Sequence, residues 1–265
     1  MSIKVVIRNL LDKTFGLREL KELLREINTK IDGNTLNVQG HWKLRTFRSF
    51  KLLLDSRSMV DSTILKQGDW EAESWQLLMR VLERFPSDVK IFLDVGSYFG
   101  LYALKAFETK EFTRIVAFEP DKVNASQLRA NLILNDLSSE IECFEIFLSD
   151  TSGQKSMAAS SNWSWNRGMS GTEVDSEVRR SIVESKSLDE VISASNQLIV
   201  IKVDVEGGEL ATLNGARNLF AQNQVILLIE NISNVIEQRK LLLELGFSLV
   251  CEIPKDSNWI WKNFN

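Results

Sequence analysis

LDVGSYFGLYAL, residues 93–104, is the stretch of sequence that decides the fold. An apolar run ends at Asp94, Gly96 and Gly100 flank a short polar turn, and a helical pattern follows. Glycine is needed where a backbone turns sharply and approaches a ligand too closely for a Cβ atom. Such a turn also points the amides of a helix N-terminus at whatever lies above it. We therefore predict a strand–turn–helix unit that binds a ligand through Asp94, Gly96, Ser97 and Gly100.

This motif is a weak signal by itself, because a tight strand-to-helix turn without a ligand has the same sequence. It also departs from the G-x-G-x-x-G fingerprint of dinucleotide-binding proteins, since its two glycines lie four residues apart. A pyrophosphate ligand is therefore less favoured. An NAD-dependent oxidoreductase of the Rossmann type stays open as an alternative.

Short apolar runs alternate with helical patterns from residue 89 onward. Several runs are apolar at consecutive positions, which is typical of strands covered on both faces in a mainly parallel sheet. Only residues 254–258 separate the last two runs, so a hairpin with one antiparallel strand is expected there. The expected strands are Val89–Val95, Arg114–Phe118, Ile141–Leu148, Leu198–Val205, Val225–Glu230, Phe247–Ile253 and Trp259–Trp261, and the clearest helices are Lys122–Asn135 and Val235–Leu245.

Residues 1–85 have a different hydrophobic periodicity. Apolar residues from Leu17 to Ile31 recur every three or four positions, which predicts an amphipathic helix. A second helical pattern covers Trp70–Phe85 and ends at Pro86. We predict a helical N-terminal extension over 1–85, followed by an α/β domain over 86–265. Within that domain, Met157–Gly171 has no periodicity and contains two tryptophans, so it is a candidate lid.

Two acidic positions follow the next two predicted strands. Glu119 ends the strand in IVAFEP, nineteen residues after Gly100. An acid there can accept two hydrogen bonds from ribose hydroxyls in a nucleoside-binding sheet. Ser149 and Asp150 end the following strand, where a small polar residue and an acid could hold the amino group of a nucleobase. The same pair is also a common turn signal.

The predicted strand in IVIKVDVEGGEL, residues 199–210, has charged residues at its C-terminal end. Lys202, Asp204 and Glu206 are spaced by two, so they share one face and emerge at the carboxyl edge of the sheet. Ligands bind at that edge in open α/β sheets. Because buried charges are costly unless paired, these residues favour a site over a core. Glu230 ends the next predicted strand at the same edge.

These motifs, in this order, resemble the FkbM family of S-adenosylmethionine-dependent methyltransferases. The resemblance covers about residues 89–231 and implies a class I, Rossmann-like fold with a seven-stranded, mainly parallel sheet whose last strand is antiparallel. It implies S-adenosylmethionine as cofactor. Residues 1–85 lie outside the resemblance, and we expect them to form a lid or an acceptor-binding element. The motifs are Asp94-Val-Gly96 with Gly100, AFEPD at 117–121, RANLILN at 129–135, SLDEV at 187–191, and IKVDVEGGE at 201–209 with LNGA at 213–216.

The resemblance also assigns residues by position. Asp94, Gly96 and Gly100 would contact the methionine part of the cofactor, Glu119 the ribose and Asp150 the adenine. The remaining cofactor-binding candidates are Ser97, Ser149 and Asp204.

Family members are generally associated with O-methylation of sugars, polyketides and similar hydroxyl acceptors. Amino-group methyltransferases of this fold usually carry an Asn/Asp-Pro-Pro-aromatic motif, and here that place reads Asp204-Val-Glu206-Gly. We therefore expect a hydroxyl of a sugar, glycan or related small molecule to be methylated. Asp204 or Glu206 is the expected base, Lys202 orients a carboxylate or the acceptor, and Glu230 completes the catalytic candidates.

Two further alternatives stay open. Asp204 with Glu230-Asn231 is similar to the ligand arrangement of catechol-type O-methyltransferases, where oxygen ligands hold Mg²⁺ against the acceptor. We favour instead a pairing of Glu230 with Lys202, so a divalent metal is possible but not favoured. A non-catalytic nucleoside-binding or interaction module is less favoured, because a site without chemistry need not keep these acids.

Composition excludes several classes. The chain has 265 residues, 44% hydrophobic and 26% charged, as an ordinary globular protein does. Its longest apolar run, Val225–Ile229, is far shorter than the about 18 residues of a membrane span. With no signal-peptide pattern either, we expect a cytoplasmic protein. The single histidine, His41, excludes a Ser/His/Asp triad and a multi-histidine metal site.

Residues 1–60 hold 12 Lys or Arg against 6 Asp or Glu, so this arm could contact phosphate groups. A solvated helix face is the favoured interpretation, and basic and aromatic residues are not interleaved as in RNA-recognition modules. We therefore do not expect a nucleic-acid acceptor. No pattern indicates an oligomeric state.

Overall fold

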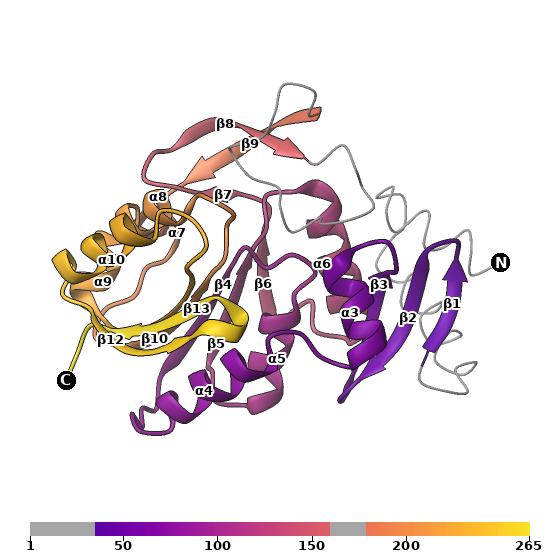
Figure 1. Cartoon of the computed structure of the whole chain (residues 1–265), viewed down its shortest axis with the longest axis horizontal. Coiled ribbons are helices and arrows are strands. Elements are labelled where there is room, and N and C mark those ends of the chain that lie inside the picture. Colours follow the sequence, from indigo (N-terminus) through magenta and orange to yellow (C-terminus); the bar gives the residue numbers. More distant parts are fainter. Residues whose placement is uncertain (1–34, 160–178) are drawn as a thin grey trace.

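The computed structural model describes residues 35–159 and 179–265, and a seven-stranded sheet forms its centre (Figure 1). The order of the strands across this sheet is β12-β13-β11-β10-β4-β5-β6. Smaller three-stranded sheets, β1-β2-β3 and β7-β9-β8, accompany it. The central strands are β4 (Lys90–Val95), β5 (Arg114–Phe118), β6 (Ile141–Phe144), β10 (Leu198–Val203), β11 (Gln224–Glu230), β12 (Ser248–Ile253) and β13 (Asn258–Lys262).

Strand directions in the central sheet confirm the predicted mainly parallel topology. β10 runs parallel to both β4 and β11, with Lys202 opposite Asp94 in the register. β13 is antiparallel to β11 and β12, and the turn Pro254–Asp256 joins it to β12 as the predicted hairpin. The carboxyl ends of β4, β5, β10 and β11 therefore meet at one edge, which is where ligands bind in such sheets.

Helices cover both faces of the sheet, as the uninterrupted apolar runs predict. Phe92, Val200 and Leu228 face one layer, which includes α4 (Ala72–Leu82), α5 (Leu101–Thr109) and α6 (Lys122–Leu134). Their strand neighbours, such as Leu93 and Leu227, face the other layer. That second layer consists of α7 (Leu188–Val191), α8 (Glu209–Asn214), α9 (Arg217–Gln222) and α10 (Val235–Glu244).

The N-terminal extension differs from its prediction. Residues 35–55 form an antiparallel sheet of β1 (Thr35–Gln39), β2 (Trp42–Phe47) and β3 (Phe50–Asp55) rather than a helix. The physical reason is the alternation of buried and less buried residues along β2, which has the period of a strand and not of a helix. The predicted helix over Trp70–Phe85 is confirmed by α4, which follows α3 (Met59–Gln67). The predicted stripe from Leu17 to Ile31 lies outside the described residues.

Hydrogen bonds fix the small sheet to the main domain, because three carboxamides of α6 pair with the backbone of edge strand β3. Asn135 accepts from Lys51 N and donates to Lys51 O, both at 2.8 Å. Asn131 Oδ1 accepts from Leu53 N at 2.7 Å, and Gln127 Nε2 donates to Leu53 O at 2.9 Å. Residues four apart lie on one face of a helix, so α6 takes the place of a neighbouring strand.

The third sheet breaks one predicted strand in two. Ile141–Leu148 divides into β6 and β7 (Phe147–Leu148), and β7 pairs with β9 (Arg179–Lys186) beside β8 (Gly153–Ala159). β8 takes the first residues of the predicted lid, and residues 160–171 lie outside the described ranges. A capping box between Ser187 and Glu190 opens α7.

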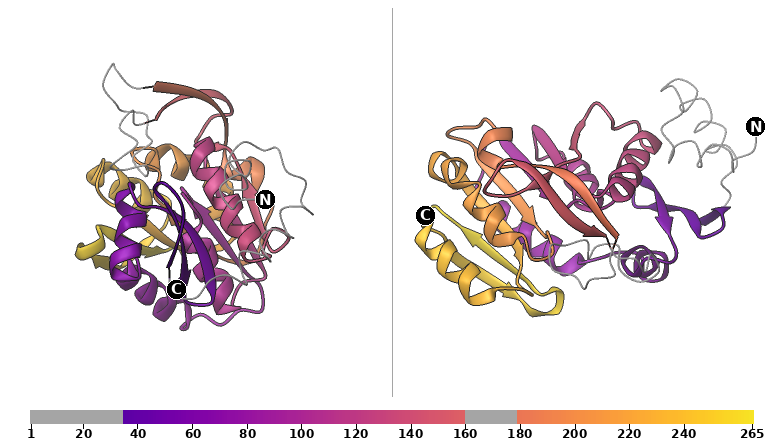
Figure 2. Two further views of the ribbon diagram at one scale, coloured as in Figure 1. Left: turned by 90° about the vertical axis from the view of Figure 1, so that its right-hand side faces the viewer. Right: turned by 90° about the horizontal axis from the view of Figure 1, so that it is seen from above.

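The molecule is elongated, with the β1–β3 sheet at one end and the β12–β13 hairpin at the other (Figures 1 and 2). Within the two described ranges, no helix combines the length and the hydropathy that crossing a bilayer requires.

Candidate active site

A cavity of about 640 Å³ opens at the carboxyl edge of the central sheet. One side is lined by the β4–α5 turn and by the ends of β5, β10 and β11. The other side is lined by α3, by the connection to α4, and by the turn between β12 and β13. The site therefore combines the central domain with the N-terminal extension.

Packing explains both glycines of the β4–α5 turn. Gly96 has φ +80°, and a Cβ there would lie 1.7 Å from the carbonyl oxygen of Asp204. Gly100 has φ +89°, and its Cβ would lie 2.3 Å from Leu128 Cδ1. The amides of Gly96 and Ser97 both donate to Phe118 O at 3.0 Å, which joins the turn to the end of β5. Glycine is therefore required at both positions by contacts within the protein, and the predicted approach of this backbone to a ligand stays a prediction.

Asp94 is buried at the base of the turn and lines the cavity. Its Oδ2 accepts from Ala103 N at 3.0 Å, whereas Oδ1 has no hydrogen-bond partner in the described part of the chain. Burial raises the pKa of Asp94 to about 6, although Lys202 opposes this. A buried acceptor without a donor is unusual in a folded protein, and it suits the ammonium group of an amino acid ligand.

Glu119 lines the same cavity, and its carboxylate orders the two neighbouring turns. Oε2 accepts from Tyr98 N at 2.8 Å and Oε1 accepts from Asp121 N at 3.0 Å. Burial raises the pKa of Glu119 to about 8, because it outweighs these two hydrogen bonds. Oε1 also accepts from Asn124 Nδ2 at 3.4 Å, whereas Oε2, among the described residues, accepts only from Tyr98 N and can accept a second hydrogen bond, as from a ribose hydroxyl.

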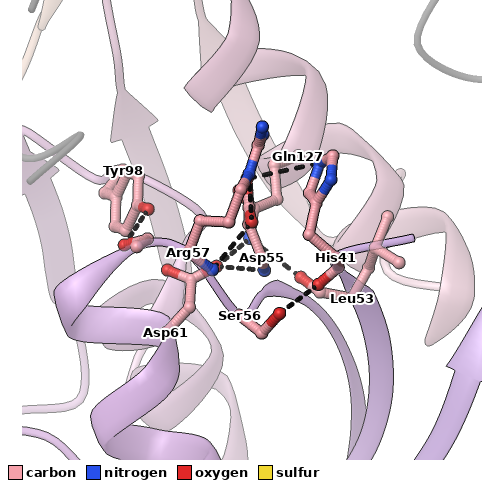
Figure 3. Close-up of polar contacts among 9 residues, drawn as sticks. His41, Leu53, Asp55, Ser56, Arg57, Asp61, Tyr98 and Gln127 are labelled. Atoms are coloured by element: carbon pink, nitrogen blue, oxygen red, sulfur yellow. Dashed lines mark hydrogen bonds and ion pairs between the residues drawn. The ribbon is translucent and has the colours of Figure 1, made fainter. Parts of the chain in front are cut away.

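Tyr98, between the two glycines, connects the turn to the N-terminal extension, a contact that sequence reasoning missed. Its hydroxyl donates to Ser58 Oγ at 2.8 Å, and Ser58 directly precedes α3. Figure 3 shows the Tyr98 side chain beside the corner between β3 and α3. In that corner Arg57 binds Asp55, with Nη2 at 2.9 Å from Oδ2. The extension therefore supports the glycine turn.

Ser149 and Asp150 do not reach the cavity, which corrects their predicted place beside a nucleobase. Ser149 is buried and Asp150 is exposed, with Lys155 Nζ 4.0 Å from its carboxylate. The chain leaves the central sheet after β6 because β7 pairs with β9, and this carries both residues away. Ile146, Phe147 and Leu148 line the cavity instead.

Three predicted catalytic acids do come together. Asp204, Glu206 and Glu230 each place a carboxylate oxygen within 4.8 Å of the other two. Lys202 is buried beside them, and its Nζ donates to Asp204 Oδ2 at 2.7 Å. The expected pairing of Glu230 with Lys202 is therefore replaced by an ion pair with Asp204, since positions 202 and 204 lie on one strand face.

The pKa values of Glu206 and Glu230 are raised by different amounts. Burial and the charge of Asp204 raise the pKa of Glu206 to about 7 and that of Glu230 to about 9. Burial lowers the pKa of Lys202, but facing carboxylates outweigh it and raise that pKa overall. Near neutral pH, Glu206 can therefore accept a proton, whereas Glu230 keeps its proton. Pairs of this kind mark acid and base roles in enzymes.

The three carboxylates are also ligands of the type that Mg²⁺ binds. Acidic groups of this kind are common without an ion. The metal therefore stays the less favoured prediction.

Sequence reasoning missed the opposite wall. Glu71 lines the cavity, and its Oε2 accepts from the Tyr102 hydroxyl at 2.8 Å. Tyr102 lies within the quoted 93–104 stretch, so an aromatic residue with a polar tip at the second position of the helix was a usable signal. Glu71 stands in a polar stretch before a helix and carried no signal of its own.

Comparisons with known proteins agree with this fold. The sequence profile described as "Methyltransferase FkbM domain" matches residues 94–249. No protein of curated function matches the sequence significantly.

Similar solved structures include a ribosomal protein L11 methylase from Lactobacillus delbrueckii subsp. bulgaricus, with 16% identity over 72% of this chain and 77% of that chain, at a TM-score of 0.40. A putative RNA methyltransferase from Pyrococcus horikoshii has 13% identity over 91% of this chain and 94% of that chain, at 0.40. A putative methyltransferase from Streptococcus mutans in complex with SAH has 8% identity over 71% of this chain and 96% of that chain, at 0.44. Likenesses this distant carry no argument about the substrate.

Proposed function

Because this chain belongs to the methyltransferase FkbM family, we propose that it transfers the methyl group of S-adenosylmethionine to a hydroxyl of a sugar, glycan or related small molecule. The observation that carries the proposal is the acid pair Glu206 and Glu230, which shares one cavity with the glycine turn. The turn after β10 also reads Asp204-Val-Glu206-Gly, without the adjacent prolines usual in amino-group methyltransferases. Both features favour oxygen as the methylated atom.

The residues of the turn fit the cofactor. Asp94 Oδ1, the buried acceptor without a donor, would bind its ammonium group, and Glu119 would accept from the ribose hydroxyls. Ile146 and Leu148 offer apolar surface to the base in place of Asp150. When bound, S-adenosylmethionine supplies an electrophilic methyl group on a sulfonium centre. Alignment of an acceptor against such a group can contribute up to about 7–11 kcal/mol in ideal systems.

Glu206 is the proposed general base, because a base works best when its pKa lies near the operating pH. Its pKa of about 7 meets that condition. Glu230, with a pKa of about 9, keeps its proton and donates a hydrogen bond that orients the acceptor. Asp204 is held by Lys202 at 2.7 Å, so it supplies fixed charge rather than proton transfer. Of the two bases expected from the sequence, Asp204 and Glu206, we therefore propose Glu206.

The substitution Glu206→Gln tests this assignment. We expect kcat for transfer to hydroxyl acceptors to fall by about 10²–10⁴, the usual contribution of a positioned base. The dissociation constant for S-adenosylhomocysteine should stay within about twofold, because Glu119 and Asp94 are unchanged. Asp150→Asn, outside the cavity, is the matched control and should retain full activity. An unchanged kcat in Glu206→Gln would remove the proposed base.

A further inference from the structure

One wall of the cavity comes from residues N-terminal to the family match. Residues between Met59 and Ala72 line it, whereas the family profile begins at residue 94. This wall includes Trp70 and Glu71. Burial raises the pKa of Glu71, the charge of Lys202 lowers it and the charge of Asp204 raises it, so Glu71 lies near the proposed catalytic residues. A segment outside the family domain thus borders the place where an acceptor must lie.

Glu71 is held in an uncommon conformation. It precedes α4 with φ +48° and ψ +43°, in the left-handed region that a non-glycine residue enters rarely. Its Oε2 accepts from the Tyr102 hydroxyl of α5 at 2.8 Å, and the residue lines the cavity. Such conformations persist only where the surrounding structure enforces them, and they concentrate at functional sites.

Lys105 is the group that enforces this conformation. Its side chain is fully buried on α5, and its Nζ donates to Trp70 O at 2.9 Å and lies 2.7 Å from Asp69 Oδ1. The same Nζ lies 5.4 Å from the centre of the Tyr102 ring. A buried ammonium is costly unless it is paired, and here both bonds go to the two residues before Glu71. Lys105 does not itself line the cavity, so it acts by positioning this segment.

We propose that Glu71 is an acceptor-binding residue, positioned by Lys105, which selects polyhydroxyl acceptors that carry no phosphate or carboxylate beside the reacting hydroxyl. This inference rests on the proposed methylation of a hydroxyl. A carboxylate accepts hydrogen bonds from sugar hydroxyls, and Trp70 adds aromatic surface that can contact a sugar ring.

Charge decides against anionic acceptors. The acids that line the cavity include Glu71, Glu206, Glu230 and Asp256, against two lysines among the described residues, Lys255 and Lys202, and Lys202 is already paired with Asp204. A phosphate or carboxylate placed among these acids would meet the charge of those that are ionised, with Lys255 as the one lining lysine not already paired with Asp204. The same repulsion would act on the backbone of a nucleic acid.

The test uses the full chain, a panel of neutral methyl glycosides and their 6-phosphates, and three substitutions. Glu71→Gln should raise KM for the best neutral glycoside by about tenfold or more, with kcat little changed, because a charged hydrogen bond is lost. Lys105→Met should raise KM in the same direction. Glu73 is an exposed acid in the first turn of α4, so Glu73→Gln is the matched control and should change neither constant. The phosphorylated glycosides should not be methylated.

S-adenosylhomocysteine affinity, measured by calorimetry on each variant, separates an acceptor effect from a folding defect. It should stay within about twofold in Glu71→Gln, because Glu71 does not contact the cofactor turn. If Lys105→Met loses its affinity for S-adenosylhomocysteine, that variant is misfolded, and the inference is tested by the KM of Glu71→Gln alone.

An unchanged KM in Glu71→Gln, or a preference for the phosphorylated glycosides, would overturn this inference and leave the proposed function in place. If the wild-type protein binds S-adenosylhomocysteine but neither binds nor methylates any neutral glycoside, both proposals are wrong.

Discussion

The two halves of the cavity are built in different ways. The half that we propose for the cofactor uses the ends of two neighbouring strands, with Asp94 and Gly96 at the end of β4 and Glu119 directly after β5. The half that we propose for the acceptor takes its residues from three distant segments, around Glu71, Glu206 and the turn after β12. In this proposal the cofactor is bound by local backbone geometry, whereas the acceptor is bound by side chains that the fold brings together. The two halves should therefore respond to substitution in different ways.

The largest effect is expected at the turn. Gly96→Ala would place a methyl group 1.7 Å from the Asp204 carbonyl oxygen, at a φ of +80°. We expect S-adenosylhomocysteine affinity to fall more than about 100-fold, together with a lower melting temperature, since backbone cannot yield as a side chain can. Gly40 also has a positive φ, but a Cβ there would have no atom within 4 Å. The substitution Gly40→Ala therefore measures the effect of backbone strain without a clash. Equal effects of the two substitutions would contradict the close approach.

A smaller effect concerns the ionisation of Glu119. Its pKa of about 8 arises from burial, with the Asp121 charge adding to it. Hydroxyl donors favour the ionised carboxylate, so binding should release a proton below that pKa. Affinity for S-adenosylhomocysteine should therefore rise from pH 6 to about 8 and then level off. Calorimetry across this range should show the slope in the wild-type protein and lose it in Glu119→Gln; a slope that survives the substitution belongs to another group.

The bond between the extension and the turn predicts a modest change. Tyr98→Phe removes the donor to Ser58 but keeps the ring beside Phe99, whose centroid lies 4.9 Å away. A single hydrogen bond contributes about 0.5–1.5 kcal/mol, so affinity for S-adenosylhomocysteine should fall about three- to tenfold. Ser58→Ala should have a similar effect, and the double variant should be no worse than either single one. Additive losses would mean that the two side chains act separately.

The smallest effect is expected from a chelator. EDTA should leave turnover of the purified protein unchanged, because Lys202 already compensates Asp204 and Glu230, with a pKa of about 9, holds a proton near neutral pH. The assay is S-adenosylhomocysteine release with and without added Mg²⁺. Loss of activity in EDTA that Mg²⁺ restores would revive the metal alternative and change the role of Glu206.

The central fold could be predicted because its signals are local. Consecutive apolar residues in β10 and β11 predict strands covered on both faces, and both strands have that environment. The β1–β3 sheet was not predicted, because a two-residue alternation over residues 42–47 is short and helical patterns flank it. Pairing with α6 stabilises it, and one sequence cannot show that pairing.

In the candidate site too, local sequence signals predicted some residues correctly, whereas residues placed by contacts with distant segments were missed or misplaced. Asp94, Gly96 and Glu119 lie where their motif predicts, because strand ends and turns fix their direction. Asp150 was placed wrongly, since the pairing of β7 with β9 turns the chain away from the cavity. Glu71 could not be found from sequence, because its position depends on Lys105 and Tyr102 of another helix.

The most direct test of the central claim is the identity of the methylated atom. Wild-type protein is incubated with S-adenosylmethionine carrying an isotopically labelled methyl group and with neutral methyl glycosides, and the products are analysed by mass spectrometry and NMR. The account predicts a labelled O-methyl ether on a glycoside and its loss in Glu206→Gln. A label found only on amines or on RNA, or a protein that binds NAD and not S-adenosylhomocysteine, would contradict it.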